Sequence, residues 1–273
     1  MTTTTLVAKR SALRANLRFM GALIVTNLKA AVAQRGKFWL QVIFMIVNNF
    51  AFLIFWWALF KRVGSLRGWV ANDVWLLYGE CALAFGLLQM FAGGVRHISR
   101  WVDQGELDPL LVQPKATWLY AIGSRAQPSG IGDFISGAAL VGASGYVRWH
   151  NLPLLIVCVL CSACVFLGAA LAFYSISFWW RRTEALSRQA TEFLLLFSMY
   201  PESLFSGLLR VLLFSLLPAG FVSYVPVHIL RDGRLREVPL LLAAAAGFLS
   251  LGVWVFGRGL RRYASGSRFG IWG

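Results

Sequence analysis

The stretch FWLQVIFMIVNNFAFLIFWWALF, from Phe38 to Phe60, decides the class of fold, because it contains no charged side chain. As a helix it would be about 35 Å long, enough to cross about 30 Å of hydrocarbon. The 273-residue chain is 58% hydrophobic and only 14% charged, whereas soluble domains are roughly 45–50% apolar. These features predict an all-α, polytopic membrane protein in which residues 1–273 form a single transmembrane domain.

Further apolar runs follow this first span along the chain. They cover Val74–Val95, Ser129–Val147, Leu152–Trp180 and Val238–Gly257, and we predict them to be the second, third, fourth and last spans. The third run is rich in glycine, serine and alanine. Such small residues let helix backbones approach one another closely in lipid.

The segment Phe193–Ile229 is too long for one crossing, since a straight helix of this length would extend roughly 55 Å. Prolines and a glycine interrupt it. We predict a fifth crossing followed by an outward-facing re-entrant element over residues 216–230. Broken helices at membrane depth require cover by protein or a water-filled cavity, so we expect this segment beside a transport path. The candidate path residues are Tyr200, Glu202, Arg210, Pro218, Tyr224 and Pro226.

Four charged residues lie within or close to apolar runs, where an unpaired charge is costly. Glu80 and Asp133 stand near opposite ends of their spans, which favours positions at the membrane interface. Glu202 and Arg210 would be about 12 Å apart along a continuous helix, too far for a direct ion pair. Either a structural role or a place along the path is consistent with the sequence.

Residues 9–33 form a candidate N-terminal interfacial helix. Leu13, Leu17, Met20 and Ile24 recur at helical spacing, and arginines lie off this stripe. An amphipathic helix on the cytoplasmic membrane surface is the favoured interpretation, and an ordinary surface helix is the alternative. Lys29 interrupts the apolar stretch, which argues against a cleaved signal sequence.

Charge distribution predicts the orientation. A topology of six crossings with both termini in the cytoplasm places most of the 26 Lys and Arg residues on the cytoplasmic side, as the positive-inside rule requires. Seven crossings would move the basic C-terminal segment outside. The net charge of +15 therefore indicates membrane orientation and contact with lipids, and we expect no nucleic-acid binding.

The cytoplasmic loop over residues 96–125 contains GELDPLLVQP, from Gly105 to Pro114. Asp108 followed by Pro109 is typical of a helix cap and first turn, and Gln113-Pro114 would end the helix. A short apolar helix in this position suits docking to a partner, or packing on the membrane surface. The residues that would form this docking element are Gly105, Glu106, Leu107, Asp108, Pro109, Leu110 and Leu111.

Three segments together carry a resemblance that covers essentially the whole chain. GELDPLLVQP resembles the coupling-helix segment of type-2 ABC transporter permeases of the six-span exporter branch. Tyr200-Pro201, followed by LLPAGFVSYVP over Leu216–Pro226, is similar to the fifth span and re-entrant element of that family. FGRGLRRYASG, over Phe256–Gly266, resembles its C-terminal signature. Ala264 departs from the acidic residue expected there, which leaves open what the tail contacts.

The resemblance implies a permease subunit of an ATP-driven exporter in a bacterial cytoplasmic (inner) membrane. Its partners would be a second permease subunit, related or identical, and two cytoplasmic ATPase subunits. ATP and Mg would bind to those ATPases, because this chain contains no GxxxxGK[ST] sequence and no cofactor is expected in it. Aromatic and aliphatic spans favour an amphipathic or hydrophobic substrate, taken from the cytoplasm or the inner leaflet.

Two alternative functions follow from membrane chemistry in general. An ion-coupled carrier or channel without an ATPase would normally show midplane charges and internal repeats, and no repeat is evident. A membrane-embedded enzyme needs convergent polar groups, whereas His97, His150 and His228 lie in separate segments and neither HExxH nor GxSxG occurs. We therefore expect no catalytic site.

The cysteines suggest packing rather than a metal site. Cys158, Cys161 and Cys164 share one apolar run, and Cys81 lies in another. Helical geometry spreads the first three over a broad arc, and no carboxylate lies in that run. Small apolar side chains packed between helices are the expected role.

The predicted topology can be tested by cysteine-accessibility labelling in intact cells. Single cysteines introduced at Thr4 and Ser267 should be protected from an impermeant reagent, and one at Ser65 should react. Reaction of the Ser267 site from outside would contradict the six-span topology.

Overall fold

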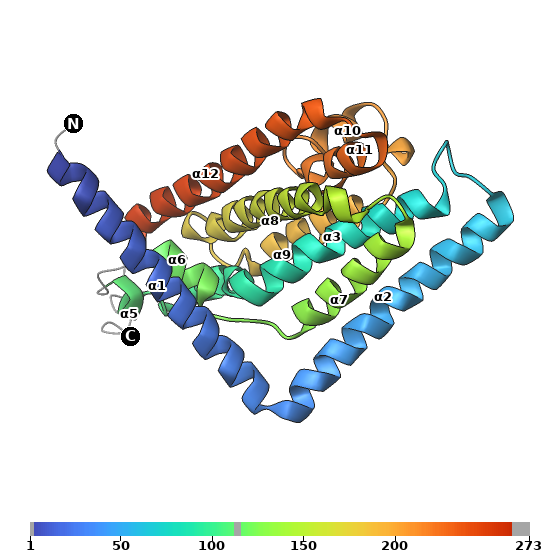
Figure 1. Cartoon of the computed structure of the whole chain (residues 1–273). Coiled ribbons are helices and arrows are strands. Elements are labelled where there is room, and N and C mark those ends of the chain that lie inside the picture. The colour runs from blue at the N-terminus through green and yellow to red at the C-terminus, as the bar shows by residue number, and fades with distance from the viewer. Residues whose placement is uncertain (1–2, 112–115, 264–273) are drawn as a thin grey trace.

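A computed structural model describes residues 3–111 and 116–263 of the chain, which is built from helices (Figure 1). The all-α prediction is confirmed. The helices are α1 (Thr3–Ala33), α2 (Arg35–Val63), α3 (Ala71–Ala92), α4 (Ile98–Gln104), α5 (Asp108–Leu111), α6 (Thr117–Gly123), α7 (Ser129–Ser144), α8 (Leu152–Ser175), α9 (Glu184–Ser198), α10 (Leu208–Leu212), α11 (Val225–Asp232) and α12 (Val238–Arg262).

Four helical segments in the described part of the chain are long and apolar enough to cross a membrane. They correspond to the predicted first, second, fourth and last spans. The predicted third span is α7, of 16 residues. The segment 193–229 is divided among α9, α10, a π-helix and α11. The number of crossings, and the re-entrant placement of 216–230, stay predictions.

The bundle has two ends. The loop end carries α5 and α6, and the distal end carries the connections 64–70 and 145–151 together with residues 199–237 (Figure 1). Helices α2, α3, α7, α8, α9 and α12 run between these ends.

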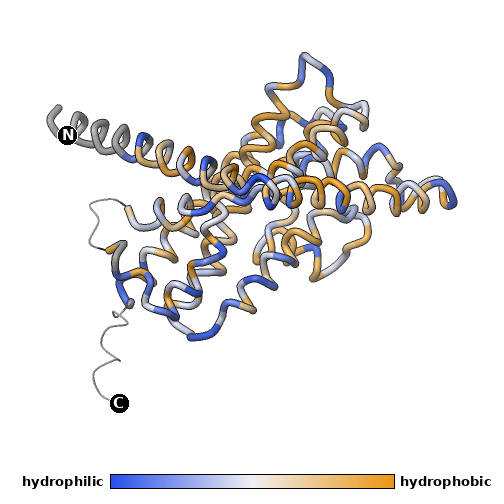
Figure 2. Tube along the Cα trace, turned by 90° about the horizontal axis from the view of Figure 1, so that it is seen from below, coloured by the Kyte–Doolittle hydropathy of each residue, from blue (hydrophilic) through white to orange (hydrophobic). Residues whose placement is uncertain are grey.

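Helix α1 is longer than the predicted 9–33 segment and meets α2 at a corner (Figure 1). It packs on α6, where the Asn27 side-chain amide donates a hydrogen bond of 2.7 Å to the Gly123 carbonyl oxygen. The Phe19 and Tyr120 rings stack with centroids 6.3 Å apart. Figure 2 shows polar residues at intervals along α1, whereas α2 is hydrophobic over most of its length. The interfacial position of α1 stays a prediction.

Close contact between α3 and α7 forms the centre of the bundle. Two glycines on α3 face two on α7. A Cβ atom at Gly137 would lie 2.7 Å from the Gly79 carbonyl oxygen, and one at Gly130 would lie 2.7 Å from the Gly86 carbonyl oxygen. Cβ atoms do not tolerate such distances, so only glycine permits this approach. The close packing expected of the small residues in 129–147 is confirmed at Gly130, Gly132 and Gly137.

The second close contact joins α8 to α12. Gly252 of α12 lies directly against the backbone of Gly168 of α8, so a Cβ atom at either position would collide with the opposite helix. Cys158 and Cys161 are buried elsewhere on α8, within the main hydrophobic core. This agrees with packing as their role.

We expect Gly137→Ala to destabilise the bundle by about 1–3 kcal/mol, because the added methyl group overpacks the α3–α7 contact. Gly142→Ala, on the same helix, is the matched control, since a Cβ atom there meets nothing within 4 Å. Thermal unfolding in detergent measures both variants. Equal stability of the two would show that the glycine contact does not hold the helices.

Candidate functional site

The predicted coupling loop begins with a turn that requires glycine. Helix α4 ends at Gln104, and Gly105 adopts a left-handed conformation with φ of 75°. Glycine reaches this region at little cost. The backbone N–H of Glu106 donates to the Trp101 carbonyl oxygen at 3.0 Å. The turn therefore directs the chain from α4 into α5.

Leu107 anchors the loop to the bundle. Its side chain is 0% exposed and belongs to the main hydrophobic core. In this structure Leu107 cannot be presented to a partner, so its role differs from that of the exposed residues around it. Burying a leucine contributes about 1.5–3 kcal/mol, which fixes the loop in place.

Helix α5 itself projects from this anchor. Leu111 is 43% exposed, and Glu106 is also exposed. The helix begins at Asp108, so Asp108 is its first residue rather than the residue before it. The predicted stop at Gln113-Pro114 lies outside the described residues, as do the side chains of Pro109 and Leu110.

The loop end is tied to the long helices below it. The Asp103 carboxylate on α4 accepts a hydrogen bond from the Arg182 backbone N–H at 3.1 Å. The Ser99 hydroxyl, also on α4, donates to the Tyr174 carbonyl oxygen at 3.0 Å. Arg182 lies just before α9, and Tyr174 lies near the end of α8. These hydrogen bonds join α4 to the end of α8 and to the start of α9.

A cavity of about 440 Å³ with a mixed polar and apolar lining opens beside this end, between the α1–α2 corner and residues 125–129. Lys37, His97 and Arg125 contribute to its lining. Of these, Lys37 and Arg125 give this part of the cavity a basic character.

The predicted path residues lie toward the distal end, and one prediction about them was wrong. Arg210 Nη2 lies 3.7 Å from Glu202 Oε2. The two residues were expected to be too far apart, on the assumption of a continuous helix. The chain instead turns at Gly207, whose φ is 61°, and α10 returns toward Glu202.

Glu202 is also the centre of a wider polar network. The His228 Nε2 atom lies 3.2 Å from Glu202 Oε1, and His228 Nδ1 lies 3.4 Å from Glu237 Oε2. The hydrogen bond with His228 lowers the pKa of Glu202. The imidazole thus connects the start of segment 202–212 to the approach to α12.

The same end contains a second cluster around Asp73. Its carboxylate accepts a hydrogen bond of 2.6 Å from the Tyr146 hydroxyl and lies 3.7 Å from Arg231 Nη1. The Arg231 guanidinium lies over the Trp69 ring, 5.0 Å from its centroid. Sequence reasoning missed this cluster, because it treated Arg231 only as an orientation signal. The mixture of basic and acidic residues over 231–237 was the available indication.

Pro218, Tyr224 and Pro226 are buried, so they do not line an open surface of this chain. The Tyr224 hydroxyl donates to the Phe197 carbonyl oxygen at 2.7 Å. A π-helix over Gly220–Tyr224 directly precedes α11. Because Pro226 lacks the N–H that a regular turn would use, the wider turn relieves the clash with the preceding carbonyl. Tyr200, in contrast, is partly exposed and packs against Trp56 of α2, with ring centroids 5.7 Å apart.

Glu80 and Asp133 are both buried inside the bundle. Their predicted depth near the membrane interface stays a prediction. Glu80 is 0% exposed and accepts a hydrogen bond of 2.8 Å from the Ser162 hydroxyl of α8. Asp133 is 2% exposed and accepts one of 3.0 Å from the Asn49 side chain. The Tyr78 hydroxyl donates a hydrogen bond of 2.9 Å to the side-chain oxygen of Asn49. These groups join α2, α3, α7 and α8.

Comparisons with known proteins address the identity of the chain. Residues 46–267 match the family described as ABC-2 family transporter protein. No curated protein matches, and no solved structure matches. The matched region includes α3 to α12 and most of α2. The chain therefore belongs to the ABC-2 transporter family, whose members are membrane transport components, or permeases, that work with ABC ATPases.

Proposed function

We propose that this chain is the membrane permease of an ATP-driven exporter, with α5 as the element that couples it to the ATPase. In this proposal a second permease, identical or related, and two ATPase subunits complete the complex. The membrane is the bacterial inner membrane, with both termini in the cytoplasm. The cargo is an amphipathic or hydrophobic molecule that leaves the cytoplasm or inner leaflet.

The observation that carries the proposal is the construction of the coupling loop. Gly105 provides a fixed turn, Leu107 is buried, and Leu111 is exposed four residues later. A leucine held in solvent on a short, anchored helix suits insertion into an apolar cleft. The exposed carboxylate of Glu106 can face basic groups of the ATPase. This arrangement supports rigid-body docking.

The contacts beneath the loop provide a route for the motion. When two ATPase subunits approach each other on binding ATP, α5 would move with the cleft that holds it. The Asp103–Arg182 and Ser99–Tyr174 hydrogen bonds join α4 to α8 and α9. Movement of the loop would thus change the position of α9 and, through it, the segment 199–232.

The distal segment is the proposed outer part of the substrate path. Tyr200, Glu202 and Arg210 have exposed or partly exposed side chains, whereas Pro218, Tyr224 and Pro226 form the packed support behind them. A short π-helix is a frequent feature of functional sites. Here it would let α11 shift relative to α9 when the path opens.

Leu110→Asp combined with Leu111→Asp should abolish binding of the ATPase, because two charges would have to enter an apolar cleft without partners. Loss of two buried leucines alone would weaken binding by about 3–6 kcal/mol. Co-purification in mild detergent and ATP hydrolysis in lipid measure the effect.

Leu235→Asp is the matched control, since Leu235 is 60% exposed at the distal end. This substitution should leave ATPase binding unchanged. Normal insertion of each variant is checked by its elution in gel filtration. If the double variant inserts normally and still binds and stimulates its ATPase, α5 is not the coupling element.

Pro226→Ala should convert the π-helix over Gly220–Tyr224 into a regular α-helix, because alanine restores the missing backbone donor. The change of register would break the hydrogen bond from Tyr224 to Phe197. We expect reduced transport and reduced stimulation of ATP hydrolysis by cargo, with ATPase binding retained. Pro239→Ala is the control, since Pro239 occupies the first turn of α12, where proline is neutral. Equal transport by both variants would argue against a role for the π-helix.

A further inference from the structure

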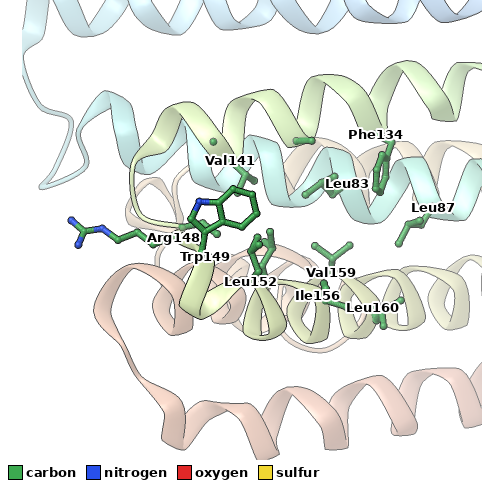
Figure 3. A pocket seen from close by; sticks show the side chains of 14 residues that line it. Leu83, Leu87, Phe134, Val141, Arg148, Trp149, Leu152, Ile156, Val159 and Leu160 are labelled. Carbon is green, nitrogen blue, oxygen red and sulfur yellow. The ribbon is translucent and has the colours of Figure 1, made fainter.

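A groove of about 770 Å³ lies between α3, α7 and α8 (Figure 3). Leu83 of α3 and Val141 of α7 contribute to its walls, together with Val159 of α8. Phe134 and Gly142 of α7 also line it, together with Ile156 and Leu160 of α8.

The side chains that line the groove differ between its main part and its distal end. Along the helices the lining is aliphatic or aromatic. At the α7–α8 connection stand Arg148 and Trp149, and Trp149 is 87% exposed. Figure 3 shows the Arg148 guanidinium extending outward past the end of α8, away from the apolar side chains. Among the described residues, no carboxylate pairs with this guanidinium.

The backbone holds this end in a fixed shape. The Arg148 N–H donates to the Asn151 side-chain oxygen at 2.6 Å, and the Asn151 side-chain nitrogen donates to the Tyr146 carbonyl oxygen at 3.2 Å. The cation is therefore attached to an ordered turn, even though its side chain is exposed.

The length of the groove along α8 is close to the hydrocarbon thickness of one membrane leaflet. From Leu152 to Leu160 it follows α8 for about 12 Å. Half of the hydrocarbon core is about 15 Å thick. A transmembrane helix of a partner protein would need an apolar surface about 30 Å long, so the groove fits an acyl chain better than it fits a helix.

We propose that this groove is a binding site for an anionic phospholipid of the leaflet at the distal end. One acyl chain lies between α7 and α8 over Leu83, and Arg148 binds the phosphate by charge-assisted hydrogen bonds. Trp149 lies at the level of the headgroup, where its indole is favoured. The charge of Arg148 and the leaflet-length apolar lining together select the ligand. The proposal does not depend on the direction of transport.

The test uses the full chain in phosphatidylcholine vesicles that contain phosphatidylglycerol with a photoreactive group on its acyl chain. After irradiation, peptide mass spectrometry should locate the label on groove residues such as Phe134, Ile156 and Leu160. Gly142→Leu should reduce this labelling several-fold, because a Cβ atom at Gly142 meets open space and the leucine would fill the groove. Gly247→Leu, at another open glycine on α12, should leave the labelling unchanged.

The headgroup assignment has its own pair of variants. Arg148→Gln should lower labelling by the phosphatidylglycerol probe about fivefold, the usual effect of one interfacial arginine on anionic lipid. It should leave labelling by the matching phosphatidylcholine probe unchanged. Arg236→Gln, an exposed distal arginine outside the groove, should change neither.

Three results would overturn the proposal. Label spread evenly over the lipid-facing helices, with no effect of Gly142→Leu, would mean bulk lipid only. Equal labelling by the two probes, unaffected by Arg148→Gln, would remove the anionic headgroup. Efficient disulfide formation between two copies carrying Gly142→Cys in the same vesicles would show that protein, rather than lipid, covers the groove.

Discussion

The fold depends on the approach of α3 and α7 to backbone contact. In lipid, helices gain little from burying apolar surface, so van der Waals contact and hydrogen bonds must hold them together. The pairs Gly79–Gly137 and Gly86–Gly130 lie about two turns apart on antiparallel helices, and each permits contact that a methyl group would prevent. This contact fixes the register of α7 on α3, and with it the positions of both ends of α3.

The same approach brings buried polar groups within hydrogen-bonding distance. Tyr78, Asn49 and Asp133 join three helices, and Glu80 reaches Ser162 on a fourth. Hydrogen bonds are difficult to replace where water is scarce. They therefore oppose any sliding of α3 against its neighbours, and they give the centre of the bundle a unique arrangement. A rigid centre is suited to passing a displacement at one end to the other.

The two ends differ in structure. At the loop end, an anchored turn presents a small apolar helix, and hydrogen bonds from α4 connect it with α8 and α9. At the distal end, charges from distant segments are paired: Asp73 lies beside Arg231, and Glu202 contacts both His228 and Arg210. These pairs cross between elements that would have to separate if the distal end opened. The Arg210 side chain is 57% exposed, so its ion pair with Glu202 contributes modestly, which is compatible with repeated opening.

The sequence by itself determined the all-helical class, the four longest apolar helices, the close packing of the third apolar run and the family, because these follow from composition, length and local motifs. It also located the start of the short helix α5, since Asp108-Pro109 is a local backbone signal. Only the tertiary structure decided that Leu107 is an anchor, that Glu80 lies inside the bundle, and that Glu202 meets Arg210. Each of these depends on how helices distant in sequence pack or where a helix breaks. Hydrophobic periodicity describes one helix at a time and carries no information about which other helix packs against it.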